Sequence, residues 1–137
     1  MRQVERGDSH QGQGIVEFAL VIPIFLLLVF GTIEFGWLLF ANHSATNATR
    51  EGARYAMVNG ERSGSVATVS SVNDVVVEYA GRFGDRIETT RVEFDPDPEP
   101  GNKVTVETRF LHEPIVGMII GTGELTLTNE STVIVQY

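Results

Sequence analysis

The sequence predicts an α+β fold: a long N-terminal transmembrane helix continues into a small acidic domain with a second helix and an antiparallel sheet of three or four strands. Three observations support this prediction. The block from Ile15 to Ala41 is apolar except for Glu17 and Glu34. Several later segments alternate apolar with polar residues, which is the period of strands. The chain has 137 residues, which leaves room for one span and one modest domain.

The membrane span is predicted from Phe18 to Ile33, extending toward Trp37. This stretch is apolar on every face, as a helix surrounded by lipid requires. Residues 1–14 are polar, show no periodicity that could bury a face, and are interpreted as a leader that is not a folded element. A secretory signal peptide is the competing interpretation, but the apolar block is longer than such a signal and has no A-x-A-like site at its end.

Beyond the span, the first helix is predicted to continue to residue 58. A stripe of small residues at spacings of three and four would let another backbone approach closely, and simple solvent-exposed alanine is the equally open alternative. The stripe consists of Ala41, Ala45, Ala48, Gly52 and Ala56.

The remaining elements follow from breakers and periodicity. Asn59-Gly60 and Ser63-Gly64 end the first helix, and a second, amphipathic helix is predicted to end near Gly84. Its valine content leaves a strand as the rival interpretation. The predicted inner face of this helix carries Val66, Val69, Val72, Val76, Ala80 and Phe83.

Two strands are predicted over 86–94 and 104–110, joined by the loop DPDPEPGN, whose prolines and glycine cannot continue a ladder. A last extended stretch, 125–137, would complete the sheet, with the second helix across one face. The apolar segment Pro114–Gly121 is too short to span a bilayer, so a buried connection is the first interpretation and a membrane-touching or partner-binding loop the alternative.

The composition and motifs argue against catalysis and nucleic-acid binding. The net charge of -8 is unsuited to phosphate neutralisation, and the absence of cysteine removes disulfides and thiolate chemistry. There is no G-x-S-x-G, and the G-x-G at Gly12 lacks the third glycine of a dinucleotide loop. The histidines have no metal-ligand spacing and are interpreted as surface residues: His10, His43 and His112. The acidic residues of the predicted hairpin loop lack EF-hand spacing and are interpreted as a solvated turn: Asp95, Asp97 and Glu99.

The chain is therefore predicted to be a non-enzyme without metal, cofactor or small-molecule substrate. A membrane-tethered hydrolase that uses an unrecognised carboxylate pair in a deep pocket is the remaining catalytic alternative.

The start of the span carries the most specific signal. Gly12-Gln13-Gly14-Ile15-Val16-Glu17-Phe18 resembles the processing site of type IV pilin-like precursors, in which a glycine precedes the cut and a glutamate is fifth after it. The longer run GQGIVEFALVIPIFLLLVFGTIEFGWLLF, followed by NATREGARYAMV, is similar to the amino-terminal signature of TadE-like proteins of the tight-adherence pilus system.

This resemblance implies a pilin-like chain with a cytoplasmic leader at 1–12, a transmembrane and extended helix at 13–58, and an extracytoplasmic domain at 59–137. An aspartyl prepilin peptidase would cut between Gly12 and Gln13 on the cytoplasmic side. The orientation also comes from the resemblance, because arginines flank the apolar block in equal number on both sides: Arg2, Arg6, Arg50 and Arg54.

The implied function is that of a minor pilin or pseudopilin of the bacterial cytoplasmic membrane, acting in assembly of a tight-adherence pilus for surface adhesion. The implied partners are the prepilin peptidase, a second pseudopilin, the small major pilin, the membrane platform and its ATPase, besides the bilayer. The alternative is an uncleaved single-pass protein whose acidic outer domain is a binding module.

The two glutamates of the apolar block receive different interpretations. A carboxylate inside an apolar helix requires a partner, and cleavage would create an amino group on Gln13, one helical turn before Glu17. Pairing within the chain or with a neighbouring subunit would align helices in register, whereas the alternative is a Glu17 that snorkels to the inner interface. Glu34 is interpreted as a solvated carboxylate at the outer interface, where Trp37 is also expected to lie.

Overall fold

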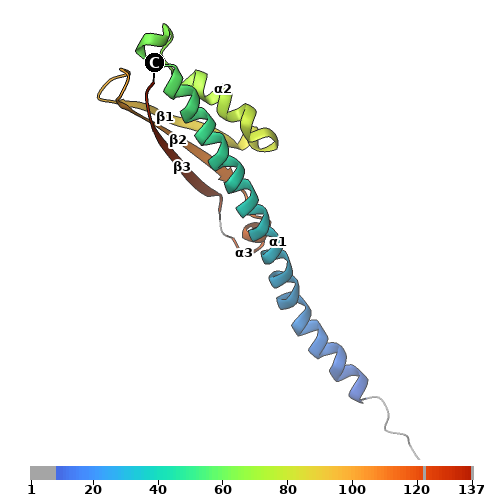
Figure 1. Ribbon diagram of the computed structural model, residues 1–137. Coiled ribbons are helices and arrows are strands. Elements are labelled where there is room, and N and C mark those ends of the chain that lie inside the picture. The colour runs from blue at the N-terminus through green and yellow to red at the C-terminus, as the bar shows by residue number, and fades with distance from the viewer. Residues whose placement is uncertain (1–8, 122, 137) are drawn as a thin grey trace, which may run out of the picture.

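A long helix and a two-layer domain beside its C-terminal half make up the molecule (Figure 1). The computed structural model describes the backbone of residues 9–121 and 123–136. In chain order, the elements are α1 (Ser9–Val58), η1 (Glu61–Ser63), α2 (Val69–Ala80), η2 (Gly81–Arg86), β1 (Ile87–Asp95), β2 (Lys103–His112), α3 (Ile115–Ile120) and β3 (Leu125–Ile134). The predicted α+β class, with one long apolar helix, a second helix and an antiparallel sheet, is confirmed.

α1 is one unbroken helix of 50 residues with Pro23 inside it. It already begins at Ser9, so the prediction that all of residues 1–14 are without secondary structure is wrong for 9–14; residues 1–8 lie outside the described part of the chain. Extending an existing helix gains a hydrogen bond for each residue fixed, without a new nucleus, so polar residues can continue it.

The sheet has three strands in the order β1-β2-β3, all antiparallel. Arg86 belongs to η2 and not to the first strand. β3 ends at Ile134, although the backbone continues the contact because Val135 donates to the Asn102 carbonyl at 2.8 Å. Tyr137, the last residue of the predicted strand, lies outside the described residues.

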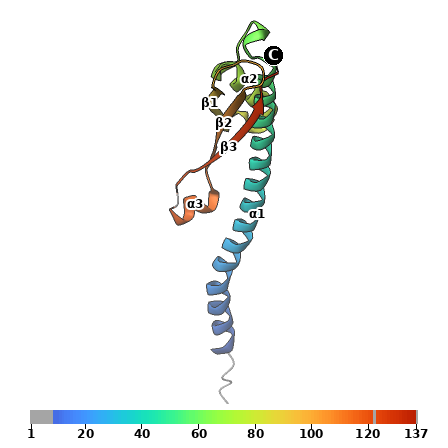
Figure 2. The same cartoon turned by 60° about the vertical axis from the view of Figure 1, so that its left-hand side comes forward.

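Both long helices pack on one face of the sheet (Figures 1 and 2). α1 packs on β2 and β3, and α2 packs on β1 and on α1. Alternate residues of β2 point into this layer and are buried: Val104, Val106, Thr108, Phe110 and His112. Their neighbours on the strand, including Glu107 and Arg109, face the uncovered side.

α2 is shorter than predicted. Thr68 caps it by accepting from the backbone N–H of Ser71, which fixes the start at Val69. Val66 and Val69 are therefore exposed, in contrast to the prediction, whereas the later members of that face are buried: Val72, Val76, Ala80 and Phe83. Because these four residues lie on helical turns, the strand interpretation is wrong.

The stripe of small residues on α1 lies in the core of the domain. All five of its residues are buried, so the alternative of solvent-exposed alanine is wrong. They are Ala41, Ala45, Ala48, Gly52 and Ala56. A Cβ added at Gly52 would lie 2.6 Å from Cγ2 of Val76 and 3.1 Å from Cγ1 of Val72. The stripe therefore brings α2 against α1 within the chain.

Candidate functional site

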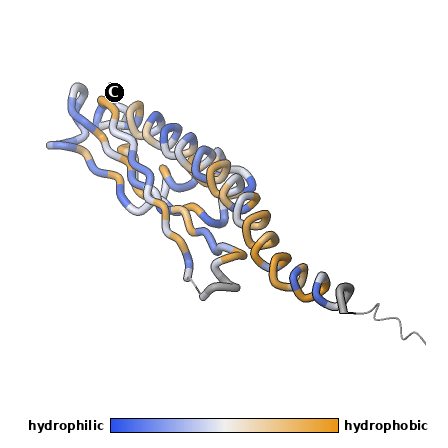
Figure 3. The backbone as a smooth tube through the Cα atoms, turned by 90° about the horizontal axis from the view of Figure 1, so that it is seen from below, coloured by the Kyte–Doolittle hydropathy of each residue, from blue (hydrophilic) through white to orange (hydrophobic). Residues whose placement is uncertain are grey.

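The N-terminal part of α1 exposes apolar side chains that no described part of the chain covers. Its most apolar window of 18 residues has a mean hydropathy of 2.5 and 0% of that window is buried. In Figure 3 this half of α1 projects from the domain as a mostly apolar rod with polar turns near its start. The helix is long and apolar enough to cross a membrane, which fits a single-pass membrane protein.

Gly12 and Gln13 are neighbours at the exposed start of this rod, and Glu17 lies about one helical turn later. A Cβ at Gly12 would meet no atom within 4 Å, and neither would one at Gly14. Neither glycine has a positive φ. Packing and backbone conformation therefore give no reason for glycine at these positions.

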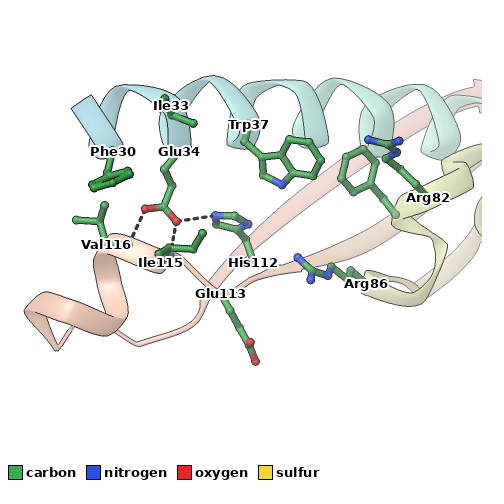
Figure 4. Close-up of a pocket in the computed structure, with 11 residues that line it drawn as sticks. Phe30, Ile33, Glu34, Trp37, Arg82, Arg86, His112, Glu113, Ile115 and Val116 are labelled. Carbon is green, nitrogen blue, oxygen red and sulfur yellow. Dashed lines mark hydrogen bonds and ion pairs between the residues drawn. The ribbon is translucent and has the colours of Figure 1, made fainter. Parts of the chain in front are cut away.

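Glu34, at the outer end of the apolar stretch, is not the solvated carboxylate that the sequence suggested. Its side chain is 14% exposed and accepts hydrogen bonds from the backbone N–H groups of Ile115 and Val116, the latter at 2.8 Å (Figure 4). The first N–H groups of a helix have no partner within the helix, so the carboxylate satisfies two orphan donors of α3. Whether Glu34 and Trp37 lie at a membrane interface stays a prediction.

His112, interpreted from the sequence as a surface residue, is buried beside this carboxylate. Its side chain is 4% exposed, and Nε2 lies 3.6 Å from Oε1 of Glu34. The strand alternation gave a signal for this, because His112 shares the inner face of β2 with Thr108 and Phe110. His43, by contrast, is exposed as expected, and the side chain of His10 lies outside the described residues.

The pocket around Glu34 has a volume of about 450 Å³, and its lining changes from apolar to basic along α1. Phe30 and Val116 lie at one end and Arg82 and Arg86 at the other (Figure 4). Among the described residues that line it, there is no serine, threonine, cysteine or lysine. The second acid in its described lining, Glu113, is exposed and directs its carboxylate away from Glu34, so these two acids do not face each other.

An aromatic cluster joins the span to the domain. Phe83, which is buried, makes edge contacts with Trp37, Phe40 and Phe110 at centroid distances of 5.7, 5.7 and 5.8 Å. The guanidinium of Arg82 lies over the Trp37 ring, 5.9 Å from its centroid. Trp37 thus packs partly on the domain and stays partly exposed.

The acidic loop between β1 and β2 is exposed, as predicted for a solvated turn. Asp97 is used locally, since its Oδ1 accepts from the Asn102 side chain at 2.6 Å and from the backbone N–H of Glu99 at 3.0 Å. Among the described residues, no group of three or more histidine, aspartate or glutamate side chains could hold a metal ion.

The similarity of this chain to known proteins lies in its N-terminal part. No curated protein and no solved structure shows significant similarity to it. The model of one protein family does match, and the match covers the proposed processing site, the apolar stretch, Glu34 and most of the small-residue stripe. That family is described as TadE-like protein and the match spans residues 12–54, which confirms the predicted resemblance for this segment of the chain.

Proposed function

We propose that this protein is a minor pilin or pseudopilin that acts in assembly of a tight-adherence pilus, with a contribution to surface adhesion through that pilus. The observation that carries the proposal is the uncovered apolar half of α1 within a segment that matches the TadE-like family. In this proposal the helix anchors the protein in the bacterial cytoplasmic membrane, with the domain of residues 59–137 outside.

Processing at the Gly12–Gln13 bond is supported by the surroundings of Gly12. Glycine weakens a helix relative to alanine, so an exposed helical glycine with open space around it has a cost that the fold does not require. Recognition by a prepilin peptidase, which must approach the backbone closely, supplies a reason for the residue. The mature chain would then begin at Gln13.

Glu17 would acquire a partner through this cleavage. It lies one helical turn after Gln13 on a side of α1 that the domain does not cover. A carboxylate at this depth is stabilised by the new amino group, either in its own chain or in a neighbouring subunit. Pairing between subunits would fix the relative height of their helices.

Assembly then uses the same surface as anchoring. The apolar side chains that face lipid must be covered by neighbouring helices when a subunit leaves the bilayer, because their exposure to water is unfavourable. The small-residue stripe from Ala41 to Ala56 is already buried against α2 and the sheet, so it is not free to contact other subunits, and the apolar helix contacts are assigned to residues before Ala41.

The test is the intact mass of the protein purified from its native membrane. We expect a mature chain beginning at Gln13. Gly12→Leu should retain the leader, while Gly14→Leu, a matched replacement at a helical position with equally open surroundings, should still be cleaved. A wild-type protein that retains residues 1–12 would contradict the proposal and favour the uncleaved single-pass binding module.

A further inference from the structure

The connection between β2 and β3 contains a short apolar helix whose first residue is exposed. α3 consists of Ile115–Ile120, with the sequence IVGMII, and Pro114 and Gly121 flank it without adding a charge. Ile115 is 68% exposed, so the buried connection favoured by the sequence is wrong at this residue. A helix this short cannot cross a bilayer, but it can lie in its surface layer.

The position of α3 along α1 is fixed by Glu34. The helix from Ile15 to Glu34 rises about 28 Å, which matches a hydrocarbon core of about 30 Å. If Ile15 lies at the inner boundary, Glu34 lies at the outer one. Since Glu34 binds the first N–H groups of α3, α3 lies at that level too, on the side of the domain nearest the apolar rod (Figure 2).

The contact between Glu34 and α3 pairs two kinds of polar group that would be unfavourable in an apolar environment without a partner. Unpaired N–H groups at the start of a helix are unfavourable in lipid, and so is an isolated carboxylate. Here each satisfies the other, and Glu34 is largely withdrawn from water. A loop designed only for aqueous surroundings would not require this pairing, because water would solvate both groups.

The pocket beside α3 has the polarity gradient of a membrane surface. Its apolar end contains Phe30 and Ile33, which continue the uncovered surface of the span. Its other end contains the exposed residues Arg82 and Arg86, with Trp37 between the two ends (Figure 4). Tryptophan and basic residues are typical of the headgroup layer, above an apolar layer.

We propose that residues 114–121 form a membrane foot: α3, held by Glu34, inserts into the outer leaflet of the bilayer. The partner is lipid because the foot continues the lipid-facing surface of α1 at the same depth. The inference rests on the membrane placement given under the proposed function, but not on cleavage or piliation. The foot and the span together hold the domain at a fixed depth and tilt relative to the membrane.

The absence of cysteine from the chain allows a direct test by single labelling sites. Ile115→Cys reports on the foot, Phe25→Cys on the middle of the span, and Ile134→Cys on the far end of the domain. The three native side chains have similar exposure, at 68%, 57% and 58%. Each full-length variant is labelled with a nitrobenzoxadiazole probe and reconstituted in phosphatidylcholine vesicles that carry spin labels at a shallow or a deep position of the acyl chain.

An interfacial helix lies about 5–10 Å below the headgroups, so shallow spin labels should remove about half of the Ile115 signal and deep labels less. The Phe25 probe should respond more to the deep label, and the Ile134 probe to neither. Glu34→Ala should bring the Ile115 response close to that at Ile134. Glu34→Gln, which keeps one acceptor oxygen, should reduce it less.

Four results would overturn the proposal in distinguishable ways. Quenching at Phe25 without quenching at Ile115 would refute the foot and leave the span intact. An Ile115 probe in apolar surroundings that lipid labels do not quench would show that protein, such as a second copy, covers α3. Unchanged quenching in Glu34→Ala would show that Glu34 does not hold the foot, whereas failure to quench Phe25 would refute the span itself.

Discussion

Replacing Gly52 by alanine should destabilise the outer domain, because α1 and α2 meet there without room for a side chain. The new Cβ would lie 2.6 Å from Cγ2 of Val76, about 1 Å less than the separation that two carbon atoms prefer. Overpacking of this kind costs about 1–3 kcal/mol, and the better helix propensity of alanine offsets about 1 kcal/mol. The expected net loss is about 1 kcal/mol, or roughly 4–8 °C in Tm for a domain of this size.

Thermal unfolding of the full chain in detergent, followed by circular dichroism, measures this loss. Gly36→Ala is the matched control, since it lies on the same helix and a Cβ there meets nothing within 4 Å. Val76→Ala alone should cost about 2 kcal/mol by opening a cavity. In that background Gly52→Ala should destabilise much less, because the closest methyl group is gone and only Cγ1 of Val72, at 3.1 Å, remains close. An increase in Tm for Gly52→Ala equal to that for Gly36→Ala, or strict additivity with Val76→Ala, would refute the reasoning.

Two further predictions concern the core and the span. The hydroxyls of Thr49 and Thr108 are buried and lie 2.7 Å apart. Thr49→Val should therefore cost about 1–3 kcal/mol of stability by leaving the Thr108 hydroxyl unpaired, and adding Thr108→Val should recover much of this loss in the same unfolding assay. Equal and additive losses would argue against the pair. Glu17→Ala should leave leader removal intact by mass spectrometry while lowering the yield of sheared pili, since pairing with Gln13 follows cleavage, and normal piliation would count against that role.

The architecture was predictable because it follows from local patterns. Apolar residues on every face predicted the exposed half of α1, and the two-residue alternation predicted the strands. The start of α2 was predicted less accurately, because the apolar pattern already includes Val66. The helix instead begins after Thr68, which caps it. A single capping hydrogen bond outweighed the periodicity there.

The contact at Glu34 was not predictable from a motif. Its partners are backbone N–H groups 81 and 82 residues later in the chain, and backbone donors have no residue signature. A physical signal was nevertheless present: a carboxylate in an apolar helix needs a partner, which was the argument applied to Glu17. Applied equally to Glu34, it would have predicted a buried donor, and the alternation of β2 would have placed His112 nearby.

The continuity of α1 connects anchoring to assembly. One continuous helix carries the proposed processing site, the apolar rod, Glu34 and the stripe that forms part of the core of the domain. The domain therefore cannot tilt on the span without bending this helix or breaking the contact between Glu34 and α3. If the foot lies in the outer leaflet, a subunit that leaves the bilayer must have its rod and its foot covered together, since both are apolar and joined through Glu34. A filament neighbour suited to this task would contact Phe30, Ile33 and Ile115 at once, so loss of lipid quenching at Ile115→Cys on assembly should coincide with its loss at Phe25→Cys.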